Sequence, residues 1–189
     1  MNSKTKKIVG IGLFTAIVLV LQFLGGSIRF GMFSISLVLV PIVVGAAVYG
    51  WQAGAWLGFV FGLAVLLSGD AAAFLAFDVF GTILTVLVKG TAAGLCTGLL
   101  YMAMSKFMNK YVSVLIAAIA CPVVNTGIFL LGCRLFFFEI ITAWGTAAGF
   151  ANAASYMFIG LAGTNFLIEL ATNLFLSPVI VRLISFAKK

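Results

Sequence analysis

Two long stretches of this chain contain no charged residue at all. No Asp, Glu, Lys or Arg occurs between Ile8 and Ile28, or between Phe30 and Gly69. Each stretch is at least as long as the roughly 20 apolar residues that cross a bilayer as a helix. Only 8% of the 189 residues are charged and 64% are hydrophobic, whereas soluble domains carry about 25% charged residues. The pattern predicts an all-α integral membrane protein.

The hydrophobic runs divide the chain into six predicted spans within one membrane domain, 1–189. Helices are expected because hydrocarbon offers no other partner for backbone polar groups. We expect the first run to be a retained span, since it is longer than the hydrophobic part of a signal peptide and lacks a small-residue cleavage site. Segment 135–155, rich in Gly, Ala and Thr, is predicted to be a capping loop or a re-entrant segment. The predicted spans cover residues 7–24, 34–49, 53–68, 79–104, 111–134 and 156–184.

The basic residues predict the orientation of the spans. Lysines precede the first span, Lys106 and Lys110 lie between the fourth and fifth, and lysines follow the last. By the positive-inside rule both termini are expected in the cytoplasm of a prokaryotic cell, which requires an even number of spans. Arg29 and Arg134 then lie outside, against the rule. The net charge of +7 reflects this bias rather than nucleic-acid binding, because the basic residues are not interleaved with aromatic residues on one face.

Two ionisable residues fall inside the predicted spans, Lys89 and Glu169. Charged groups in a bilayer are costly, so each indicates a functional role by default. Lys89 lies about 16 Å along its helix from Asp78, and Glu169 about 20 Å from Tyr156, so the two reach a similar depth. Two interpretations stay open. Either the pair is a structural ion pair between helices, or it forms a polar pocket that contacts a solute.

Other polar residues are expected at the same depth. Asn165, Glu169 and Asn173 are spaced i, i+4, i+8 and share one helix face. Pro122 is expected to open the fifth span locally over 121–127, next to Asn125. These groups either line a cavity or only form hydrogen bonds between helices, and we favour the cavity. The candidate substrate-binding residues are Thr85, Lys89, Asn125, Arg134, Trp144, Asn165, Glu169 and Asn173.

The residues for catalysis or metal binding are missing from the sequence. There is no His, no nucleotide-binding G-x-x-x-x-G-K-[ST] motif, and only four carboxylates. The three cysteines lie in apolar helical context and predict neither a disulfide framework nor a metal site. We therefore expect no enzyme activity, no cofactor and no metal.

Several short segments resemble the substrate-binding S components of energy-coupling factor (ECF) vitamin transporters. The resemblance covers the six-span layout and nearly the whole chain. Its motifs are specific for the superfamily but not for one vitamin. The segments that carry it are Lys6–Ala16, Pro41–Ala46, Tyr49–Gly50, Ala53–Gly58, Phe80–Leu84, Lys89–Gly90, Ala93–Gly94, Asn165–Leu170, Asn173–Leu174 and Ser177–Pro178.

The resemblance implies a role in vitamin uptake. It implies capture of a vitamin at the outer side and delivery through a transmembrane coupling subunit driven by two cytoplasmic ATPases. The Ala-xxx-Ala docking motif of the family's first helix corresponds here to Gly12 and Ala16, a small-xxx-small pair that lets another helix approach closely. Lys89 and Arg134 would suit an acidic vitamin such as pantothenate or lipoate. The alternative is a structural or assembly subunit of the membrane whose polar stripe only joins helices.

Overall fold

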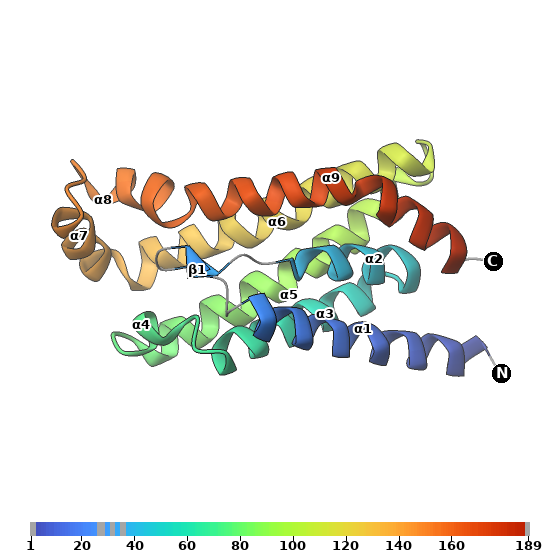
Figure 1. The fold of residues 1–189 in the computed structure, drawn as a ribbon, viewed down its shortest axis with the longest axis horizontal. Helices are drawn as coiled ribbons and strands as arrows, with labels where there is room; N and C mark the ends of the chain where they lie inside the picture. Colours follow the sequence, from blue (N-terminus) through green and yellow to red (C-terminus); the bar gives the residue numbers. More distant parts are fainter. Residues whose placement is uncertain (1–2, 26–28, 31–32, 35–36, 188–189) are drawn as a thin grey trace.

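The computed structural model describes residues 3–25, 29–30, 33–34 and 37–187, and this part of the chain is mainly helical. The long helices run along the long axis of the molecule (Figure 1). Both chain termini lie at one end, and the short helices α4, α7 and α8 lie at the other. The elements are α1 Ser3–Gly25, β1 Arg29–Phe30, β2 Phe33–Ser34, α2 Leu39–Tyr49, α3 Trp51–Leu67, α4 Ala72–Leu75, α5 Val79–Met104, α6 Lys110–Phe136, α7 Phe138–Ala147, α8 Ala153–Ser155, the π-helix η1 Tyr156–Leu161 and α9 Gly163–Ala187.

Four helical stretches are long and apolar enough to cross a membrane. They are Lys4–Gly25, Val79–Met104, Lys110–Phe136 and Ala153–Phe186. α2 and α3 are shorter apolar helices, so helix length alone supports four spans and the six-span layout stays a prediction. The second predicted span, 34–49, becomes helical only at Leu39, because residue 34 belongs to the antiparallel pair β1–β2.

The short helix α2 lies in the middle of the bundle. It contacts α1, α3, α5, α6 and α9, and most of its side chains are buried. Because neighbouring helices rather than lipid surround it, its ends can lie within the thickness of the bundle without exposing backbone polar groups to hydrocarbon.

Glycines bring α3 and α5 together backbone to backbone. Gly54 and Gly58 on α3 lie opposite Gly94 and Gly90 on α5. A Cβ atom added at any of the four would collide with the carbonyl oxygen of the glycine it faces. Small residues spaced four apart allow this close approach in membrane helices. The pair fixes the spacing between the two helices that carry Phe61 and Lys89.

The end of the bundle opposite the termini is covered by helices rather than by a loop. Segment 135–155 contains α7 and α8, joined through Gly149, whose φ of 79° suits glycine. The expectation of an opened helix at Pro122 is wrong. α6 stays helical over 121–127 with Pro122 inside it, as membrane helices tolerate proline where neighbouring helices and small local adjustments satisfy the freed backbone groups. In η1 the Ala162 N–H donates to the Met157 carbonyl over 2.9 Å, one residue wider than an α-turn.

Candidate substrate-binding site

A cavity lies between α1, α3, α4, α5, α6 and α9, toward the end of the bundle that α7 covers. The space open to the centre of a water-sized sphere is about 70 Å³, more than a single water needs. A smaller cavity of about 40 Å³ shares Lys89, Phe129 and Asn165 with it and reaches Asn125. The larger cavity is lined by Gln22, Phe61, Val65, Asp70, Ala71, Phe74, Thr82, Thr85, Val86, Lys89, Phe129, Phe137, Asn165 and Glu169.

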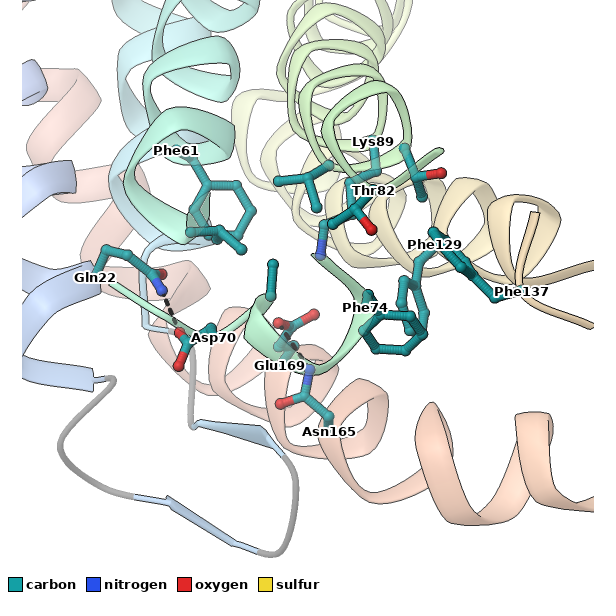
Figure 2. A pocket seen from close by; sticks show the side chains of 14 residues that line it. Gln22, Phe61, Asp70, Phe74, Thr82, Lys89, Phe129, Phe137, Asn165 and Glu169 are labelled. Carbon is teal, nitrogen blue, oxygen red and sulfur yellow. Dashed lines mark hydrogen bonds between the residues drawn. The ribbon is translucent and has the colours of Figure 1, made fainter. Parts of the chain in front are cut away.

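The ammonium group of Lys89 points into this cavity from α5 (Figure 2). Its Nζ lies 5.8 Å from the ring centroid of Phe61 and 5.3 Å from that of Phe129. Aromatic faces attract a cation at such distances. Among the described residues, no ion-pair contact within 4.0 Å reaches Lys89. The ammonium is therefore held by two rings and keeps its hydrogen-bond donors available.

Glu169 faces Lys89 from α9. The side chain is 2% exposed, and Asn165 Nδ2 donates to its Oε1 over 3.2 Å. Asn173 Nδ2 donates to the Glu169 backbone carbonyl over 2.9 Å and so braces the same stretch of helix. The charges of Lys89 and Glu169 attract each other across the cavity without touching.

Several buried oxygen atoms in and beside the cavities lack partners. Thr85 Oγ1, Asn125 Oδ1 and Glu169 Oε2 make no hydrogen bond to the described part of the protein. A buried polar atom without a partner costs about 1–3 kcal/mol. A polar cavity of this size is therefore suited to hold water or a solute that completes those bonds.

Aromatic residues form one wall. Phe74 packs edge-on against Phe129, Phe137 and Trp144, with ring centroids 5.8, 5.0 and 5.4 Å apart. Trp144 lines neither cavity. From α7 it packs against Phe74, and so it connects α7 to the aromatic wall. Phe61 lies across from this cluster, so a ligand would sit between aromatic surfaces (Figure 2).

Sequence reasoning did not identify the contact between Gln22 and Asp70. Gln22 Nε2 donates to Asp70 Oδ2 over 2.6 Å and lies 3.3 Å from Ser68 Oγ. Gln22 is buried although it lies in the apolar run of α1. The only hint in the sequence was that Gln22 places a polar amide inside this apolar run. The bond ties α1 to the turn that follows α3, at the edge of the cavity.

The predicted site residues separate into two groups. Thr85, Lys89, Asn165 and Glu169 line the larger cavity, and Asn125 lines the smaller one. Asn173 lies behind Glu169, and Trp144 lies behind Phe74. Arg134 lines neither cavity. It is exposed, and its guanidinium carbon lies 4.3 Å from the Phe138 ring centroid.

The two residues of the predicted docking motif are both exposed on α1. A Cβ added at Gly12 would meet nothing within 4 Å. Metal ligands do not gather anywhere in the described ranges, where no group of three His, Cys, Asp or Glu side chains could hold an ion.

Comparison with known families identifies the chain. The family model described as "ECF transporter, substrate-specific component" matches residues 6–181. No curated protein and no solved structure matches significantly. The family match spans almost the whole chain, including every residue that lines the two cavities. The protein is therefore a transport-related membrane protein that belongs to the family of ECF transporter substrate-specific components.

Proposed function

We propose that this protein binds a vitamin or a related small nutrient at the outer side of a prokaryotic cytoplasmic membrane and delivers it inward. The observation that carries the proposal is the cavity in which Lys89 and Glu169 face each other between aromatic walls. Unpartnered oxygens there are the polar groups that a ligand completes, and such convergent polar groups in an apolar pocket are typical of small-molecule sites.

The proposal includes a topology of six spans with both termini in the cytoplasm. α3 has 17 residues and reaches about 26 Å, close to the roughly 30 Å of a hydrocarbon core. α2 reaches only about 16 Å. Its burial among other helices supports a crossing in which the protein, not lipid, surrounds its ends. The cavity then opens toward the outside.

The proposed partners are a transmembrane coupling subunit and two cytoplasmic ATPases. α1 supplies the proposed contact, because Gly12 and Ala16 leave a flat exposed strip on which a partner helix can pack closely. Bulky neighbours would hold such a helix away.

The first test is thermal melting of the purified chain against a panel of vitamins. A ligand at 100 times its Kd stabilises the folded state by about 2.7 kcal/mol, which raises Tm by roughly 5–10 °C in a protein of this size. Lys89→Met should abolish the shift. Lys106→Met is the matched control, because it removes the same charge from an exposed position far from the cavity. If no vitamin shifts Tm, the chain is instead a structural or assembly subunit without a ligand.

A further inference from the structure

We propose that the ligand presents a neutral lactam edge, a ring carbonyl next to a ring N–H, on a small flat body. This inference rests on the proposed function and names the chemical class of its substrate. It follows from what Lys89 and Glu169 each lack, from their opposite charges and from the walls between them.

The Lys89 ammonium needs a hydrogen-bond acceptor, and the Glu169 carboxylate needs a donor. Lys89 offers N–H donors and has no acceptor within reach in the described structure. Glu169 Oε2 accepts no hydrogen bond within 3.5 Å in the described structure, although the Asn125 amide lies near this carboxylate. Because Lys89 and Glu169 face each other across one cavity, one small molecule can supply both the acceptor for Lys89 and the donor for Glu169. Adjacent carbonyl and N–H groups do so with a single edge.

Singly charged ligands fit less well. A carboxylate has only acceptors, so it would pair with Lys89 but leave Glu169 Oε2 unpartnered and bring a like charge close to it. Arg134, the second cation that would favour an acid, lies outside both cavities. A cationic ligand would satisfy Glu169 but face the ammonium of Lys89. A neutral ligand with both kinds of group avoids both conflicts.

The walls favour a flat ring. Phe61 lies on one side of the Lys89 ammonium, and Phe129 lies on the other with Phe74 packed against it. Aromatic rings prefer offset or edge-on contact with other rings. A planar heterocycle fills the space between these walls while its polar edge reaches Lys89 and Glu169.

The test compares probes of similar size on the purified protein. Lumazine, a two-ring lactam, carries the proposed edge, and 1,3-dimethyllumazine has both ring N–H donors methylated. 2-Naphthoate provides a carboxylate on two rings, and L-tryptophan provides a zwitterion. Because a hydrogen bond to a charged group is worth roughly a tenfold change in affinity or more, lumazine should bind at least about tenfold more tightly than 1,3-dimethyllumazine and 2-naphthoate. L-tryptophan tests the competing case, in which a carboxylate meets Lys89 and an ammonium meets Glu169.

Variants of the protein test whether Glu169 causes the preference for lumazine over 1,3-dimethyllumazine. Glu169→Leu, which has no hydrogen-bond acceptor, should weaken lumazine about tenfold or more, whereas 1,3-dimethyllumazine has no ring N–H and should lose no such bond. Ser177→Ala is the control, since this buried serine lies on α9 but lines neither cavity. Its affinity for lumazine should match that of the wild-type chain. The melting temperature of each variant without probe reports whether it is folded.

Each contrary result is informative. Tighter binding of 2-naphthoate or L-tryptophan than of lumazine, no binding of lumazine at millimolar concentration, or full lumazine affinity in Glu169→Leu overturns the lactam assignment. A panel vitamin that stabilises the protein in a Lys89-dependent way, but lacks the lactam edge, also overturns it while the proposed function stands. Failure of every vitamin and every probe overturns the proposed function itself.

Discussion

Replacing Gly58 by alanine should weaken the fold through one added methyl group. The new Cβ would collide with the Gly90 carbonyl oxygen and lie 2.7 Å from the Gly90 carbonyl carbon and 3.2 Å from Thr91 Cα. Carbon atoms pack best at about 3.5–4.0 Å. The obstacle is backbone, which no side-chain rotation can relieve. α3 and α5 must therefore separate by roughly 1 Å.

The cost of that separation is expected near the upper end of the range for overpacking, about 3 kcal/mol. For a chain of this length it lowers Tm by roughly 6–12 °C. The assay is thermal melting of the purified protein in detergent, without ligand. Gly12→Ala is the matched control, because the same methyl group at that position meets nothing within 4 Å. Its Tm should be unchanged or slightly raised, since alanine favours a helix over glycine.

Equal melting temperatures of Gly58→Ala and Gly12→Ala would contradict this prediction. Equal melting would mean that α3 and α5 do not meet backbone to backbone. A partial check is Gly54→Ala, whose Cβ would collide with the Gly94 carbonyl oxygen. It should behave like Gly58→Ala rather than like the control.

Three further predictions concern the cavity edge, the docking face and the topology. Gln22→Leu removes the hydrogen bond to Asp70, worth about 1.5–3 kcal/mol because the acceptor is charged, and should lower Tm by several degrees; an unchanged Tm would show that the bond adds no stability. Gly12→Trp should abolish vitamin uptake in cells while the isolated chain keeps its affinity, and persistent uptake would exclude α1 as the docking helix. A single cysteine at Lys106, in a chain without its native cysteines, should resist impermeant thiol reagents in intact cells, whereas ready labelling would reverse the orientation.

Local signals in the sequence located the long helices well. The predicted span 79–104 coincides with α5, because Asp78 interrupts the apolar run and also caps the helix, its Oδ1 accepting from the Gly81 N–H over 3.0 Å. The second predicted span began too early, because apolar residues in a short β-pair look the same as apolar residues in a helix. The spacing of the glycines on α3 and α5 carried information about packing, but not about which helix would lie opposite.

The sequence predicted which polar residues share a face and a depth on one helix. It predicted less well which side chains from different helices meet. Asn165 and Glu169 share a face, as the i, i+4 spacing requires, and both reach the cavity. Depth along a helix could not reveal that Arg134 points away from it. The bond from Gln22 to Asp70 joins residues 48 apart in the sequence, and no periodic pattern connects them.

The π-helix η1 joins α8 to α9 and so sets how α7 and α8 are oriented relative to α9. A π-turn contains one residue more than an α-turn, as though a single residue had been inserted into a regular helix. Removing one residue from Tyr156–Leu161 would restore an α-helix and rotate everything before it by about 100° relative to Glu169. A single-residue deletion in η1 would thus re-aim α7 while leaving Lys89 and Glu169 themselves intact. Insertions and deletions at this point offer natural selection a way to reorient α7 and α8 separately from the polar groups of the cavity.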